Sequence, residues 1–175
     1  MKRTYTGNKD GVAAGEHPQL TALVKELLHA YPQALWNNGT YGVRNMRAKT
    51  SLSVHATGRA GDISWRNMGD GRRGVAKGGR RYAMEAMRYL VKNADALGIE
   101  IVIDYFPSPY GRASKCDRNM AWRKYTKATV SGAPRGDWFH TEVDGKKSSE
   151  QIKAVFAANP PPAVVIPPPP SRCKI

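Results

Sequence analysis

Residues 53–62, with the sequence SVHATGRAGD, set a histidine and an aspartate seven positions apart. The two glycines between His55 and Asp62, Gly58 and Gly61, argue against a helix that carries both ligands. They permit a sharp turn instead. We therefore predict a strand that reaches His55, a glycine turn, and a second strand that begins at Asp62. Imidazole and carboxylate both bind zinc, so the stretch can supply two ligands of a metal site that needs at least one more.

The third ligand is sought among the four histidines of the chain. His17 precedes the first predicted helix at a capping position, and His29 lies near the end of that helix, where a positive imidazole suits the dipole. Both therefore have structural explanations. His140 instead lies among aromatic residues that would exclude water. A zinc ion held by His55, Asp62 and His140 would keep a fourth position for water, which is the arrangement of a catalytic zinc site.

The periodicity of apolar residues predicts the elements around this site. Helices are expected at 18–31, at about 80–97 and from Ser148 to about Ala158, where SSEQ fits a capping box. A buried strand is expected at 99–105, and shorter strands at 41–44, 62–65 and 139–143. These elements lack a regular βαβ rhythm, so we predict an α+β fold with a small antiparallel sheet flanked by helices.

The stretch also resembles a known family. Ser53, His55, Gly58, Ala60 and Asp62 match the SxHxxGxAxD signature of the D-alanyl-D-alanine carboxypeptidase-like zinc peptidases. This superfamily includes phage L-alanyl-D-glutamate endolysins and has the hedgehog/DD-peptidase fold. A second family element, an acid three residues before a histidine, matches DWFH at 137–140. The resemblance covers about thirty residues.

Carried over to this chain, the resemblance implies zinc ligands at His55, Asp62 and His140. It implies that Asp137 is the general base, with aspartate at this position as in the phage endolysins. An aspartate has a shorter reach than the glutamate of many carboxypeptidases, so it must lie closer to the attacking water. Glu142, on the same strand face as His140, is the alternative base.

An arginine upstream of the first histidine is the further expectation from the family, since a cation stabilises the oxyanion of the tetrahedral intermediate. The chain offers Arg44 and Arg47, and we favour Arg44 because Tyr41–Arg44 resembles a strand that enters the site. Ser53 would support the ligands or contact the substrate. Gly58 and Ala60 would allow close approach of the backbone.

Composition limits the partners and the compartment. With 175 residues and 41% hydrophobic residues, the chain can form one domain with its own core. A net charge of +14 favours a polyanionic partner, such as an anionic wall polymer. No apolar run is long enough to insert into a membrane, and MKRTYTGNKDG lacks the apolar region of a signal peptide. We expect a monomer made in the host cytoplasm that acts at the cell wall after release.

The chain is expected to divide into a catalytic domain, residues 1–158, and a tail, residues 159–175. The tail holds seven of the twelve prolines and is predicted to be a linker or a disordered terminus.

The predicted function is hydrolysis of an amide bond in the stem peptides of bacterial peptidoglycan, at the L-Ala–D-Glu bond. A D,D-carboxypeptidase of the same fold is the alternative. A basic nucleic-acid-binding module is disfavoured, because no recognised motif for specific nucleic acid binding is present. A non-catalytic wall-binding module is disfavoured by the acid at Asp137.

Overall fold

The structure is a computed structural model and describes residues 2–47, 49–71 and 73–164. Its elements, in chain order, are α1 (Pro18–Ala30), β1 (Trp36–Gly39), the 3₁₀ helix η1 (Val54–Thr57), β2 (Ala60–Ser64), α2 (Gly79–Lys92), α3 (Ala94–Leu97), β3 (Ile99–Asp104), β4 (Arg112–Lys115), the 3₁₀ helix η2 (Cys116–Arg118), β5 (Trp122–Lys124), β6 (Trp138–Val143) and α4 (Ser149–Ala158).

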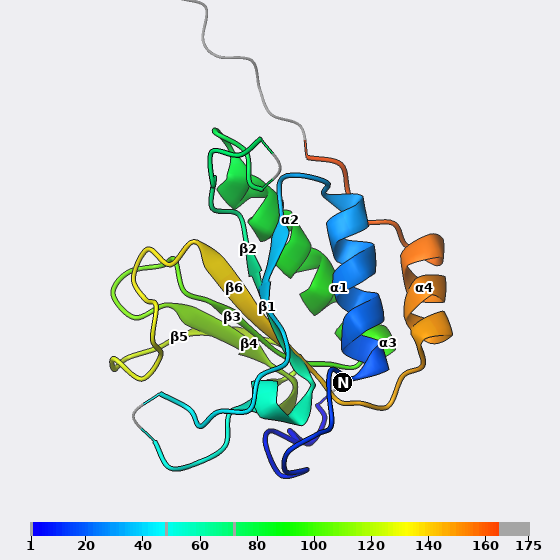
Figure 1. The fold of residues 1–175 in the computed structure, drawn as a ribbon, viewed down its shortest axis with the longest axis vertical. Helices are drawn as coiled ribbons and strands as arrows, with labels where there is room; N and C mark the ends of the chain where they lie inside the picture. The colour runs from blue at the N-terminus through cyan, green and yellow to red at the C-terminus, as the bar shows by residue number, and fades with distance from the viewer. Residues whose placement is uncertain (1, 48, 72, 165–175) are drawn as a thin grey trace, which may run out of the picture.

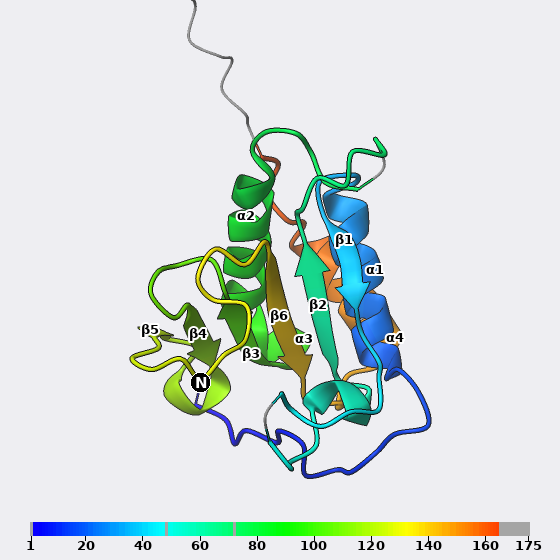
Figure 2. The ribbon, with the colours of Figure 1, turned by 60° about the vertical axis from the view of Figure 1, so that its left-hand side comes forward.

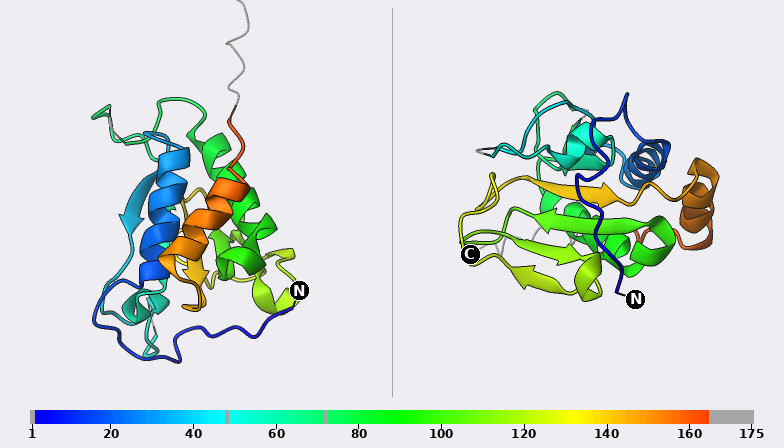
Figure 3. Two further views of the ribbon diagram at one scale, coloured as in Figure 1. Left: turned by 90° about the vertical axis from the view of Figure 1, so that its right-hand side faces the viewer. Right: turned by 90° about the horizontal axis from the view of Figure 1, so that it is seen from below.

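The strands form one six-stranded sheet in the order β1-β2-β6-β3-β4-β5, and every neighbouring pair is antiparallel. The helices α1, α2 and α4 gather on one side of this sheet (Figures 1 and 3). The predicted α+β class with an antiparallel sheet is therefore confirmed. The last strand of the sequence, β6, lies at the centre of the sheet between β2 and β3.

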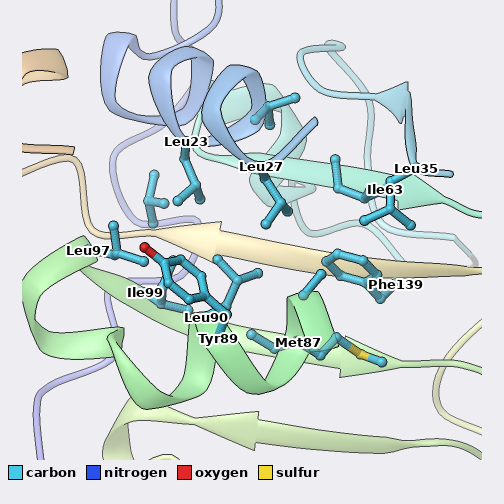
Figure 4. Packing of buried hydrophobic residues seen from close by; sticks show 14 of the residues in the cluster. Leu23, Leu27, Leu35, Ile63, Met87, Tyr89, Leu90, Leu97, Ile99 and Phe139 are labelled. Atoms are coloured by element: carbon cyan, nitrogen blue, oxygen red, sulfur yellow. The ribbon is translucent and has the colours of Figure 1, made fainter. Parts of the chain in front are cut away.

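The main hydrophobic core lies between the helices and one face of the sheet (Figure 4). Leu23 and Leu27 of α1 and Leu90 of α2 meet Ile63 of β2 and Phe139 of β6 in this layer, and all five are fully buried. Side chains alternate between the two faces of a strand. The neighbours of Ile63 and Phe139 in the sequence therefore face the opposite side of the sheet, away from the helices.

The long periodic segments were predicted well. The first helix ends one residue earlier than expected, and the buried strand at 99–105 is β3. The predicted helix at about 80–97 is two helices, because the chain leaves helical geometry at Asn93. The predicted capping box is present, with Ser148 and Gln151 each bonding the backbone of the other. None of the helices in the described residues is long and apolar enough to cross a lipid bilayer.

The short edge elements were predicted poorly. The strand expected at 41–44 is wrong, since the edge strand β1 is Trp36–Gly39, and the later segment contributes only an isolated bridge between Asn45 and Leu52. Strands β4 and β5 were missed. Their sequences, RASK and WRK, are short and largely polar, so they carry little of the β-branched alternation by which strands are recognised.

The packed chain continues beyond the predicted boundary at residue 158. The Tyr31 hydroxyl donates a hydrogen bond to the Pro162 carbonyl at 3.2 Å, and Val164 packs against the main core. The first residues of the predicted tail therefore belong to the packed domain as far as Val164. Residues 165–175, the rest of the predicted tail, lie outside the described residues.

Candidate metal centre

Two of the predicted ligands are brought together by the register of the central strands. Asp62 on β2 lies directly opposite His140 on β6, and Ile103 on β3 is the partner of His140 on the other side. These side chains form a row on the face of the sheet away from the helices. Their sequence neighbours Ile63 and Phe139 point the other way, into the helical core. The sequence thus sets a carboxylate and an imidazole side by side on a rigid, central part of the sheet.

His55 reaches the same place from a tight turn. The predicted strand at this position is wrong, because residues 54–57 form the 3₁₀ helix η1. The Ser53 hydroxyl caps this helix by accepting a hydrogen bond from the His55 backbone N–H at 3.4 Å. Gly58 then ends it with a φ of 74°, and a Cβ at this position would lie 2.2 Å from the Gly15 carbonyl oxygen. Glycine is therefore required where the chain turns into β2.

The three predicted ligands form one compact cluster. A ligand atom from each of His55, Asp62 and His140 lies within 4.8 Å of the others. His140 Nδ1 is 2.9 Å from Asp62 Oδ1, and His55 Nε2 is 3.5 Å from Asp62 Oδ2. Ligand atoms bound tetrahedrally at about 2.1 Å from a zinc ion are separated by about 3.4 Å. This group can therefore hold a metal ion with little movement.

The hydrogen bonds of the two rings support this assignment. His55 Nδ1 contacts the carbonyl oxygen of Thr40, which makes Nδ1–H the donor and turns Nε2 toward Asp62. His140 has Nδ1 on the side of Asp62, and its Nε2 lies 3.0 Å from Glu142 Oε1. A metal-binding histidine commonly donates its other N–H to a carbonyl or a carboxylate in this way. Both rings are thus turned with one nitrogen toward the centre of the cluster.

Without a metal, hydrogen bonds between the histidines and the carboxylates hold the cluster together. Burial opposes charge on His140, but the hydrogen bonds with Asp62 and Glu142 outweigh it and raise the pKa of His140 to about 10. Burial likewise opposes charge on Asp62, but the hydrogen bonds with His140 and His55 hold its pKa well below the usual range. At neutral pH, His140 is therefore an imidazolium flanked by two carboxylates, and a metal cation can replace its positive charge.

Metal binding is therefore expected to release protons. Since the pKa of metal-free His140 is about 10, a metal that takes Nδ1 must displace about one proton at pH 7. The apparent affinity should rise with pH, by about tenfold per pH unit between pH 7 and 9. Calorimetric titration of zinc in two buffers of different ionisation enthalpy measures the number of protons directly. A binding enthalpy that is the same in both buffers would contradict this protonation state.

The cluster opens into a cleft of about 490 Å³. Both candidate arginines, Arg44 and Arg47, line this cleft and are exposed, and the predicted supporting residue Ser53 lines it as well. Trp138 and Tyr105 also line it, with ring centroids 5.3 Å apart. The structure therefore brings His55, Asp62, His140, Arg44, Arg47 and Ser53 to one cavity.

Asp137 is placed differently from these residues. Its carboxylate accepts two hydrogen bonds from Arg66, at 2.6 Å from Nε and 2.7 Å from Nη2, and Asp137 does not line the cleft. Asp137 lies one residue before β6, at a bend in the chain, and there its side chain is directed toward Arg66. The proposed alternative, Glu142, is two positions after His140 and shares its face. The role of base at Asp137 stays a prediction.

We did not predict from the sequence that residues near the N-terminus line the cleft. The chain ahead of α1 passes along the end of the sheet where β6 ends and β2 and β3 begin (Figure 2). It places Tyr5, Gly7 and Asn8 in the wall of the cleft. The segment MKRTYTGNKDG carries no periodicity and no motif, so its sequence alone gave no sign of this role.

Comparison of the chain with protein-family models, with curated proteins and with solved structures finds no match.

Proposed function

We propose that the protein is a zinc-dependent hydrolase that cleaves amide bonds in the stem peptides of bacterial peptidoglycan. The observation that carries this proposal is the cluster of His55, Asp62 and His140 at a cleft. Two imidazoles and one carboxylate are a ligand set typical of catalytic zinc, which leaves a position for water or substrate. The SxHxxGxAxD and DWFH motifs, which resemble those of the zinc peptidases with the hedgehog/DD-peptidase fold, supply the ligands of this cluster.

Each residue has a role in this proposal. Zinc held by the three ligands would polarise the scissile carbonyl and activate water. Arg44, on the wall of the cleft, would neutralise the charge that develops on the carbonyl oxygen. Asp137 would accept the proton of the attacking water and return it to the leaving amine. To do so, the Asp137 side chain must leave Arg66 and turn into the cleft, which breaks two hydrogen bonds of 2.6 and 2.7 Å.

The substrate class is supported by charge. Arg44, Arg47 and Lys49 are exposed cations in the lining of the cleft. Peptidoglycan stem peptides carry carboxylates, and the surrounding wall polymers are anionic, so a chain with a net charge of +14 is attracted to both. We propose the L-Ala–D-Glu bond as the site of cleavage, with a terminal D-Ala–D-Ala bond as the alternative.

Digestion of purified peptidoglycan tests this function. The wild-type protein with zinc should release fragments with new amino and carboxyl termini, and mass spectrometry of these fragments identifies the bond. A chelator should stop the release, and added zinc should restore it. A zinc-loaded protein that leaves a broad panel of walls intact would exclude the proposed hydrolysis and favour a binding role.

Replacement of the predicted base should separate chemistry from metal binding. The substitution Asp137→Asn is expected to lower kcat by about 10²- to 10⁴-fold, the usual contribution of a positioned general base. Its zinc affinity should equal that of the wild type, because the Asp137 carboxylate lies on Arg66 and outside the ligand cluster. Steady-state kinetics and chelator competition measure the two quantities.

The matched control is Glu85→Gln, which removes a carboxylate that pairs with Arg88 on α2. It should leave both kcat and zinc affinity unchanged. If Asp137→Asn retains full activity, Asp137 is not the base, and the role passes to another group at the cleft.

A further inference from the structure

Glu142 is a buried carboxylate with two hydrogen-bond partners, and no step of the proposed hydrolysis uses it. Its side chain lines the cleft and is 6% exposed. One oxygen lies 3.0 Å from His140 Nε2, and the other accepts a hydrogen bond of 2.7 Å from the Tyr5 hydroxyl. A carboxylate removed from water in this manner is stable only when its partners keep their protons.

Glu142 determines which nitrogen of His140 is available to a metal. A carboxylate can only accept, so the bond to Glu142 places the proton on Nε2. When a metal replaces the proton on Nδ1, the bond to Glu142 keeps Nε2 protonated, and Nδ1, which lies 2.9 Å from Asp62 Oδ1 in the cluster, is the nitrogen that binds the metal. Because an imidazole rotates about two side-chain bonds, a contact at Nε2 also fixes the direction in which Nδ1 points.

The other partner of Glu142, Tyr5 of the N-terminal segment, is also held by several contacts. Burial and the neighbouring Glu142 carboxylate raise the pKa of the Tyr5 phenol well above its usual value, so the hydroxyl remains a donor. The Lys115 ammonium lies 3.6 Å from the centre of the Tyr5 ring. The next residue, Thr6, donates from its backbone N–H and its hydroxyl to Glu100, at 2.8 and 2.6 Å. Tyr5 therefore lies on an anchored segment.

We propose that Glu142 and Tyr5 are positioning residues of the metal centre: Glu142 orients His140 with Nδ1 toward the metal, and Tyr5 orients Glu142. The N-terminal segment is then part of the site through a chain of contacts that runs from Tyr5 through Glu142 and His140 to the metal. This inference rests on the proposed metal site and not on the identity of the substrate.

Metal affinity is the measurement that tests this arrangement, because it needs no substrate. Removal of a carboxylate that orients a ligating histidine typically weakens metal binding 10- to 100-fold. We expect this loss in zinc affinity for Glu142→Ala. Glu142→Gln keeps an oxygen acceptor without the charge, so it should rescue part of the affinity. Tyr5→Phe should weaken zinc binding by about tenfold or less, as expected for one hydrogen bond that acts through a second residue.

The decisive experiment is a double-mutant cycle in the full chain, with zinc affinity measured by chelator competition. Tyr5→Phe should have no further effect on affinity once Glu142 is alanine, because the contact through which it acts is gone. The visible spectrum of bound Co²⁺ should change in Glu142→Ala, which a purely structural role would not cause. Thermal melts confirm that each variant is folded.

The control is Tyr41→Phe, which removes another hydrogen bond to the N-terminal region, from the Tyr41 hydroxyl to the Ala13 carbonyl at 2.7 Å. It should leave zinc affinity unchanged. The inference is overturned if Glu142→Ala binds zinc as tightly as the wild type, or if Tyr5→Phe has the same effect in both backgrounds. Either result would leave the proposed hydrolase intact, whereas a wild-type protein that binds no zinc would overturn both proposals.

Discussion

Replacing Asp62 with alanine is expected to abolish both metal binding and the proposed hydrolysis of peptidoglycan. Asp62 is the central member of the cluster, with one oxygen 2.9 Å from His140 Nδ1 and the other 3.5 Å from His55 Nε2. A residue that only orients a ligand typically accounts for 10- to 100-fold in metal affinity. The loss of a ligand should therefore exceed about 100-fold, and hydrolysis should fall to the level of the chelator-treated protein. Chelator competition and fragment release measure the two losses.

Two further variants distinguish a metal centre from a purely structural cluster. His55→Ala should give the same loss as Asp62→Ala, because each removes one of three ligands. Ser53→Ala removes only the hydroxyl cap of η1, a contact of 3.4 Å to the His55 backbone, and should keep zinc bound with a modest loss of affinity. Tight, stoichiometric zinc binding by Asp62→Ala would show that the metal lies elsewhere and would contradict the assignment.

The ligand cluster could be predicted from the sequence because its signal is local and chemical. Gly58 and the short spacing keep His55 and Asp62 close together, and of the three other histidines only His140 had no structural explanation. The route by which they meet could not be predicted as well. His55 lies on a 3₁₀ helix and not on a strand, because the Ser53 cap and the left-handed Gly58 favour one tight turn over an extended chain.

The motif alone did not predict the direction in which the Asp137 side chain points. The motif identifies an acid three residues before His140, but this acid lies at a bend just before β6, and its carboxylate pairs with Arg66 outside the cleft. Glu142 lies within β6, two residues after His140, so the two-residue period of the strand turns it toward the cleft. Tyr5 could not be found at all, since its contact with Glu142 joins residues 137 positions apart and depends on the complete fold.

The N-terminal segment is anchored by a buried ion pair, and the loss of either charge is expected to destabilise the whole domain. Arg59 lies within the signature, between Gly58 and Ala60, and its side chain is 3% exposed, while that of Glu100 on β3 is 1% exposed. Arg59 Nη1 lies 3.5 Å from Glu100 Oε2 and donates to the Val143 carbonyl at 2.7 Å. Its Nη2 donates to the Gly7 carbonyl. One guanidinium thus joins the signature, β6 and the N-terminal segment.

We expect Glu100→Ala to lower the free energy of unfolding by about 1–3 kcal/mol, because the buried guanidinium of Arg59 then keeps only the half-exposed Asp10, 2.9 Å from its Nε, as a counter-charge. Urea denaturation measures this difference. The double substitution Arg59→Met with Glu100→Leu should recover part of the loss, since it removes both buried charges together but leaves the carbonyls of Val143 and Gly7 without the donor Arg59. As a matched control, Glu85→Ala breaks the exposed pair between Glu85 and Arg88 on α2 and should change stability by at most about 0.5 kcal/mol.

Glu100→Ala should also lower the affinity of the metal centre for zinc. Glu100 accepts both hydrogen bonds from Thr6, and Thr6 is adjacent to Tyr5. If the segment positions the Tyr5 hydroxyl, folded Glu100→Ala should bind zinc more weakly than the wild type, by no more than Tyr5→Phe does. The double substitution with Arg59→Met should not restore this affinity even where it restores stability, because it still lacks the acceptor for Thr6. Stability and zinc affinity that recover together would show that the segment contributes to folding alone.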